Sequence, residues 1–262
     1  MKTHIQSWQT EIGGRKVHYF CGGQGEPLIV IHGGGNSARA WLKNIEALAK
    51  SYTVYVPDLP GFGYTEPIRG NYFVPDLVDF IDAFARSLGL GRFHLVGHSL
   101  GGAIALSYVL KFPFKVTKLV LVSSLSLGKE IALWVRLLSQ PAVSRHIGRA
   151  VMFVLKMVKR LVDALLPSMG FMMPLSEASL YWGSCISTVK EQALNLAHRL
   201  SEVVVPTLVV WGGRDPILPV KHAYAAAELI PDCRLKVFKK SGHSVYRDEL
   251  EEFSEEVRGF LG

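Results

Sequence analysis

Short apolar runs rich in β-branched residues recur along the chain, and stretches with the spacing of amphipathic helices separate them. Runs this short are typical of strands buried on both faces of a sheet. Because strands that alternate with helices form a parallel sheet covered on both faces, the sequence predicts an α/β fold. The predicted strands span 28–31, 53–56, 93–96, 119–122, 207–211 (within an apolar run at 203–211) and 234–238, and the clearest predicted helices span 77–88 and 103–110.

The alternation of strands and helices stops once along the chain. The stretch 127–200 has helical patterning, interrupted by three prolines, and contains no convincing strand. We therefore expect a helical insertion at 127–200 within a single core domain that is made of 1–126 and 201–262.

The composition predicts a folded protein in a reducing compartment. Hydrophobic residues make up 49% of the chain and charged residues 19%, which excludes disorder for most of it. The three cysteines, Cys21, Cys185 and Cys233, form no CxxC pair, so we expect neither a disulfide framework nor a zinc site. Residues 1–11 lack the apolar core of a signal peptide. A soluble cytoplasmic protein is expected, and its net charge of +7 permits anionic partners without requiring them.

The sharpest motif is Gly97-His98-Ser99-Leu100-Gly101, a G-x-S-x-G pattern between a predicted strand and a predicted helix. A serine at the tip of a tight strand-to-helix turn has a strained backbone, and small residues two positions away avoid a collision across the turn. The helix that follows offers backbone N–H groups and the positive end of its dipole to a developing oxyanion. Ser99 is therefore the candidate nucleophile.

A serine nucleophile needs a base and an acid that orients the base. His243 lies in a loop after the predicted strand 234–238, where open α/β sheets place functional groups. Asp215 lies in a turn bounded by glycines and a proline, and it falls between Ser99 and His243 in the order that this nucleophile motif requires. We assign Asp215 as the acid. The rival acids are Glu130, Asp232 and Asp248.

A glycine run supplies the remaining part of the candidate site. His32-Gly33-Gly34-Gly35 follows the strand 28–31, which places flexible backbone close to the nucleophile. The N–H groups of Gly34 and Leu100 are predicted to form an oxyanion hole. A nucleotide-phosphate loop is the alternative for this run, but the chain has no G-x-G-x-x-G and no GK[ST] pattern.

Five motifs in this order, HGGG, DLPGFG, GHSLGG, WGGRDP and SGH, resemble the α/β-hydrolase superfamily across essentially the whole chain. The resemblance implies an eight-stranded, mostly parallel sheet with helices on both faces and a helical lid after strand six, at 127–200. It also implies Ser99 as nucleophile, Asp215 as acid and His243 as base. Thr65 is a mild departure, because the turn in this family usually has serine at that position.

Hydrolysis of a carboxylic ester, with no metal and no cofactor, is the activity expected of a Ser-His-Asp site that faces water. Serine at position 99 argues against the dehalogenases and epoxide hydrolases of the superfamily, which use aspartate. C–C hydrolases of the meta-cleavage type usually have proline, asparagine and tryptophan where this chain has Asn36, His98 and Ser244. They remain an alternative, as do cofactor-free haloperoxidases, acyltransferases and, in another class, slow-turnover receptors whose lid recruits a partner.

The expected partner is a small-molecule ester with a small to medium apolar acyl group, and no nucleic acid is expected. Seven basic residues against two acidic ones lie in 129–166. A lid that contacts an anionic membrane surface is therefore an alternative to the favoured lid, which only covers the site. The candidate substrate contacts are Asn36, Phe171, Met172, Tyr181, Trp182 and Ser244.

Overall fold

The computed structural model describes residues 4–67, 73–133 and 195–262. In this part of the chain eight strands form one sheet in the order β1-β2-β4-β3-β5-β6-β7-β8. β1, β2 and β4 are antiparallel neighbours, and every other pair is parallel. The expected eight-stranded, mostly parallel sheet is confirmed. The strands are β1 (Gln6–Ile12), β2 (Arg15–Gly22), β3 (Glu26–Ile31), β4 (Tyr52–Pro57), β5 (Phe93–His98), β6 (Val116–Val122), β7 (Thr207–Gly212) and β8 (Cys233–Phe238).

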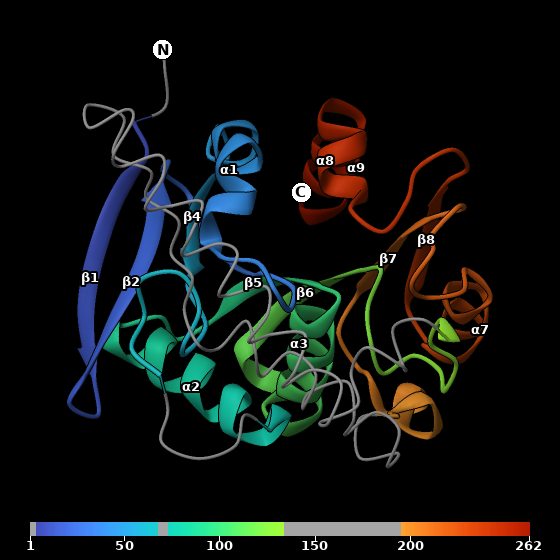
Figure 1. Ribbon diagram of the computed structural model, residues 1–262, viewed down its shortest axis with the longest axis horizontal. Helices are drawn as coiled ribbons and strands as arrows, with labels where there is room; N and C mark the ends of the chain where they lie inside the picture. The colour runs from blue at the N-terminus through green and yellow to red at the C-terminus, as the bar shows by residue number, and fades with distance from the viewer. Residues whose placement is uncertain (1–3, 68–72, 134–194) are drawn as a thin grey trace, which may run out of the picture.

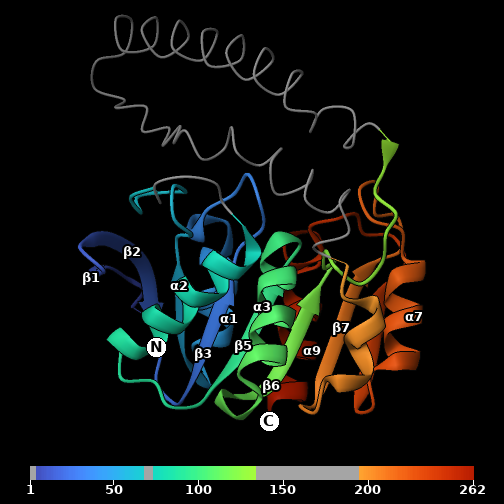
Figure 2. The same cartoon turned by 90° about the horizontal axis from the view of Figure 1, so that it is seen from below.

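Helices cover both faces of the sheet (Figures 1 and 2). Leu28 and Val30 of β3 pack in the core beneath α1 and α9, whereas Ile29 and Ile31 pack in the core beneath α2 and α3. This alternation follows from the two-residue period of a strand that is buried on both sides. The helices are η1 (Ala38–Trp41), α1 (Leu42–Leu48), α2 (Val74–Ser87), α3 (Leu100–Lys111), η2 (Pro113–Lys115), η4 (Ala197–Glu202), α7 (Lys221–Leu229), α8 (Val245–Asp248) and α9 (Leu250–Leu261).

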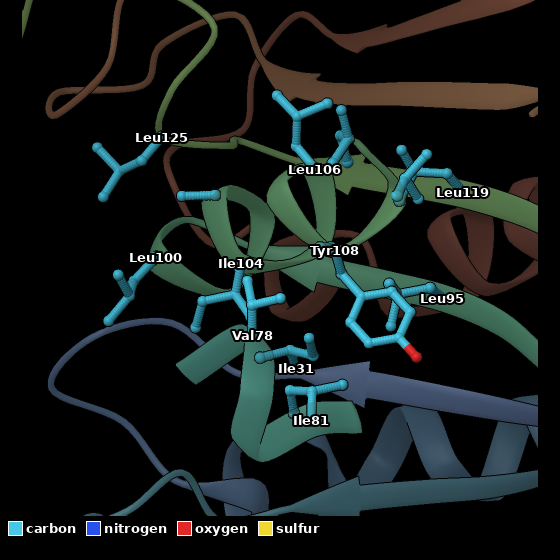
Figure 3. Packing of buried hydrophobic residues seen from close by; sticks show 14 of the residues in the cluster. Ile31, Val78, Ile81, Leu95, Leu100, Ile104, Leu106, Tyr108, Leu119 and Leu125 are labelled. Atoms are coloured by element: carbon cyan, nitrogen blue, oxygen red, sulfur yellow. The ribbon is translucent and has the colours of Figure 1, made fainter. Parts of the chain in front are cut away.

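Helix α3, which follows the candidate nucleophile, is buried between the sheet and α2. Figure 3 shows Ile104 and Tyr108 of α3 among Ile31 and Leu95 of the sheet and Val78 of α2. α3 is apolar on nearly all sides, as expected of a helix in the core of an α/β domain. The start of this helix is therefore held rigidly against the ends of β3 and β5.

Two parts of the sheet bear on the sequence expectation. β7 begins at Thr207, as expected for the strand within the apolar run 203–211, and Pro206 lies just before it. Proline has no N–H for the ladder, so the strand begins beyond it. The sequence has no apolar run that predicts the hairpin β1–β2, because every β1 residue is exposed or half-buried.

The helical insertion expected at 127–200 falls largely outside the described residues. Only its first part, up to residue 133, and its last part, from residue 195, are described. Outside the described residues lie also Cys185, the basic residues of 129–166 other than Lys129, and the candidate contacts Phe171, Met172, Tyr181 and Trp182. Within the described ranges, no helix is both long enough and apolar enough to cross a membrane.

Candidate active site

Ser99 occupies a strained turn between β5 and α3. Its φ of 52° and ψ of −114° are unfavourable for a residue with a side chain. A Cβ added at Gly97 would lie 2.2 Å from the carbonyl oxygen of Gly101, and one added at Gly101 would lie 2.3 Å from that of Ile31. Both flanking glycines are therefore required by close backbone approach, as the motif predicts.

His243 and Asp215 meet at the carboxyl ends of β8 and β7. His243 Nδ1 lies 2.7 Å from Asp215 Oδ2, and the Asp215 side chain is fully buried. The other Asp215 oxygen, Oδ1, accepts the backbone N–H groups of Ile217 at 2.8 Å and Leu218 at 3.0 Å. The carboxylate is thus fixed by three hydrogen bonds, and it orients the imidazole with Nδ1–H toward it and Nε2 free to take a proton.

His98 connects the loop of His243 with the turn of Ser99. Its Nε2–H donates to the backbone carbonyl of His243 at 3.0 Å, and the two imidazole rings lie 4.8 Å apart. Within the described part of the chain, the Ser99 hydroxyl makes no hydrogen bond to the His243 imidazole. Such a bond often forms only when substrate fills a site. The structure without substrate therefore places the serine and the candidate base on adjacent loops, without a hydrogen bond between them.

The glycine loop 32–35 packs against the turn of Ser99. A Cβ added at Gly33 would lie 3.2 Å from Ser99 Cβ and 2.7 Å from His98 Nδ1. Within the described ranges, the N–H groups of Gly34 and Leu100 donate no hydrogen bond. Leu100 directly follows Ser99, and Gly34 follows Gly33, which packs against Ser99, so both unused donors belong to the segments that the predicted oxyanion hole requires.

His32 fixes the orientation of one of these donors. It is fully buried, its Nδ1–H donates to the Gly33 carbonyl at 2.9 Å, and its Nε2 accepts the Leu59 N–H at 3.0 Å. The tautomer follows from these two partners. Because the peptide unit is planar and trans, holding the Gly33 carbonyl toward His32 turns the N–H of Gly34 to the opposite side.

Comparison with known proteins shows the family to which this fold belongs. Residues 26–250 match the model of the α/β hydrolase fold family. The chain belongs to this family. Its relatives include the dihydrolipoyllysine-residue acetyltransferase component of the acetoin cleaving system of Cupriavidus necator, 30% identical over 96% of this chain and 68% of the relative. They also include 2-hydroxy-6-oxo-6-phenylhexa-2,4-dienoate hydrolase of Burkholderia cepacia, 29% identical over 94% of this chain and 91% of the relative.

Solved structures share the fold of this α/β hydrolase over nearly its whole length. The crystal structure of a meta-cleavage product hydrolase from Pseudomonas fluorescens IP01 superposes with a TM-score of 0.75 at 23% identity, covering 97% of each chain. At this identity the superposition shows the common fold.

The rival acids of this α/β hydrolase have other partners. Glu130 binds Lys221 at 2.6 Å and His222 at 2.7 Å, and Asp248 accepts the N–H of Gly242 at 3.1 Å. Asp232 is exposed at the turn before β8, and only its backbone carbonyl makes a hydrogen bond in the described ranges, to the Thr207 N–H. Asp215 is therefore the carboxylate that the fold brings to His243.

A second Ser-His-Asp chain lies away from this site, where β1 and β2 meet the turn after β4. Ser7 Oγ lies 2.9 Å from His18 Nε2, and His18 Nδ1 lies 2.7 Å from Asp58 Oδ2. Asp58 also accepts the N–H groups of Ala38 and Tyr64, so it ties the turn together. Ser7 lies exposed in an edge strand, away from the glycine loop and the start of α3 that supply donors beside Ser99. Ser7 therefore serves as a comparison residue for Ser99.

Sequence reasoning missed the roles of His32 and His98. His32 appeared only as the first letter of HGGG, and His98 only as the residue before the serine. Both are buried, and burial lowers the pKa of His32 and lowers that of His98 well below its ordinary value, where the nearby His243 acts in the same direction. Their hydrogen bonds join segments that are distant in sequence, so only the folded structure shows them.

These lowered pKa values predict that the protein loses stability as the pH falls. An unfolded histidine takes up a proton near pH 6.5, whereas burial makes His32 and His98 take one up only at a lower pH, so between these pH values the unfolded chain binds more protons. The free energy of unfolding should therefore decrease as the pH falls from 7.5 to 5, by at most about 1.4 kcal/mol per pH unit for each histidine. Urea unfolding of the wild type and of His98→Asn measures this, and equal pH slopes in the two proteins would contradict the assignment to His98.

Proposed function

We propose that the chain is a serine hydrolase that cleaves a carboxylic ester through an acyl-Ser99 intermediate. The observation that carries the proposal is the buried Asp215–His243 pair, which is attached through His98 to the strained turn of Ser99. A carboxylate, an imidazole and a serine in this chain order are the elements of acyl transfer to serine.

In the proposed reaction, His243 Nε2 takes the proton of Ser99 as the hydroxyl attacks the ester carbonyl. Asp215 holds the imidazole in the tautomer that can accept this proton and stabilises the imidazolium that forms. The N–H groups of Gly34 and Leu100 hold the oxyanion. His243 then gives its proton to the departing alcohol, and a water activated by His243 hydrolyses the acyl-serine.

Cleavage of a C–C bond is the second candidate function, because one relative over nearly the whole chain is a dienoate hydrolase. The same three residues serve either reaction. The chain departs from that group at Asn36, His98 and Ser244, where meta-cleavage hydrolases usually carry proline, asparagine and tryptophan. These departures favour the ester.

A substrate panel separates the two candidate functions. We expect 4-nitrophenyl esters of graded acyl length to be hydrolysed with a kcat/KM at least about tenfold above that for a meta-cleavage dienoate. Higher kcat/KM for the dienoate would make the chain a C–C hydrolase. The time course of product formation also tests the slow-turnover receptor. We expect many turnovers per protein molecule. A burst of one product per protein molecule, followed by almost no further product, would indicate a receptor.

A further inference from the structure

A cavity of about 1000 Å³ lies between α1 and α8, beside the candidate site. Asn36, which follows the glycine loop, and Ser244, which follows His243, both line it. α1 and α8 lie on the same face of the sheet (Figure 1), and Asn44 joins them by donating to the Tyr246 carbonyl at 2.9 Å. The cavity therefore begins next to the base and extends along α1. Its volume is sufficient for a small organic ligand.

The charges along this cavity are mostly positive. Arg39, Lys43 and Arg247 line it, and Asp248 is the one acidic residue among the lining residues. In the described part of the chain none of the three cations forms an ion pair, and Asp248 is engaged by the N–H of Gly242. Cations in a concave site raise the local concentration of anions, so the cavity favours a negatively charged group.

Tyr246 adds a buried polar group to the same wall. Its ring is fully buried and stacks on Trp41, with the ring centroids 4.1 Å apart. Within the described ranges its hydroxyl has no hydrogen-bond partner of good geometry. Burial raises the pKa of Tyr246 to about 12, against the lowering effect of the nearby Arg247 charge and Ser244. The hydroxyl therefore keeps its proton at neutral pH and lies enclosed in the wall, behind the surface that a ligand in the cavity would touch.

We propose that this cavity binds an anionic group, a carboxylate or a phosphate, on the alcohol half of the ester substrate. The inference rests on the proposed function. His243 gives its proton to the departing alcohol, so that half of the ester lies beside His243, where the cavity begins. Arg39, Lys43 and Arg247, which line the cavity, attract the anion.

Two esters of equal shape test this proposal. The butyrate ester of 3-hydroxybenzoate carries a carboxylate where that of 3-hydroxybenzamide carries a neutral amide. We expect a higher kcat/KM for the anionic ester, a preference that falls about tenfold in the double variant Lys43→Gln with Arg247→Gln and weakens with added salt. Lys50→Gln, which removes an exposed cation outside the cavity, should leave the preference unchanged. The butyrate ester of 3-hydroxyphenyl phosphate, tested alongside, tells a phosphate preference from a carboxylate preference.

A preference that is absent in the wild type, or equal in the wild type and the double variant, would overturn the anion site. If the neutral ester is still hydrolysed and a fluorophosphonate still labels Ser99, the proposed function survives that failure. If neither ester is hydrolysed and Ser99 is not labelled, the proposed function and the anion site fail together.

Discussion

Ser99→Ala is expected to lower kcat/KM for an ester by at least about a thousandfold, because the variant cannot form an acyl-serine. The fold should persist, since alanine fits where serine fits and the Ser99 hydroxyl makes no hydrogen bond to His243 in the described structure. Steady-state hydrolysis of a 4-nitrophenyl ester measures the loss of activity, and circular dichroism with urea unfolding shows whether the fold is kept.

Two further variants make this result specific. Ser99→Gly removes the same hydroxyl and relieves the strain of a φ of 52°, so it should be equally inactive and at least as stable as Ser99→Ala. Ser7→Ala removes the serine of the second Ser-His-Asp chain and should keep wild-type activity. A fully active Ser99→Ala, or an inactive Ser7→Ala, would place the nucleophile elsewhere.

Asp215→Asn is expected to reduce kcat by about 10⁴-fold, the loss that the equivalent change causes in a serine protease. Asparagine can still accept the N–H groups of Ile217 and Leu218 through its carbonyl oxygen, so the loop should keep its shape. Its amide NH₂ would then face His243 Nδ1 and donate to it. The imidazole would carry its proton on Nε2 instead, where it cannot accept the proton of Ser99.

Asp232→Asn is the control for this change, because Asp232 is an exposed acid at the opposite end of β8 from His243, and its carboxylate makes no hydrogen bond in the described ranges. It should lose less than about twofold in kcat. Near-normal turnover in Asp215→Asn, or a large loss in Asp232→Asn, would require a different acid.

The fold could be predicted from the sequence wherever burial is continuous. Strands inside the sheet are buried on both faces, so each of β3 to β6 contains a short, largely apolar run that the sequence shows. β1 carries mostly exposed polar residues and gives no such signal. β7 begins at Thr207, directly after Pro206, because a residue without an N–H cannot donate to the ladder.

The candidate site was predictable where its residues lie in short motifs. The turn of Ser99 and the glycine loop both require close approach of the backbone, and the adjacent glycines in the sequence indicate this requirement. His98 was not predictable, because its partner is the carbonyl of His243, 145 positions along the chain. The cavity between α1 and α8 was equally hidden, since Lys43 and Arg247 come together only when these helices pack on one face of the sheet.

The most direct test of the proposed mechanism is the covalent adduct itself. The wild-type protein is treated with a fluorophosphonate, and its intact mass and its peptides are measured by mass spectrometry. We expect one adduct per chain, on the peptide that contains Ser99, and no adduct in Ser99→Ala. Labelling that persists undiminished in Ser99→Ala, or that maps to the peptide of Ser7, would contradict the assignment of Ser99 as the nucleophile.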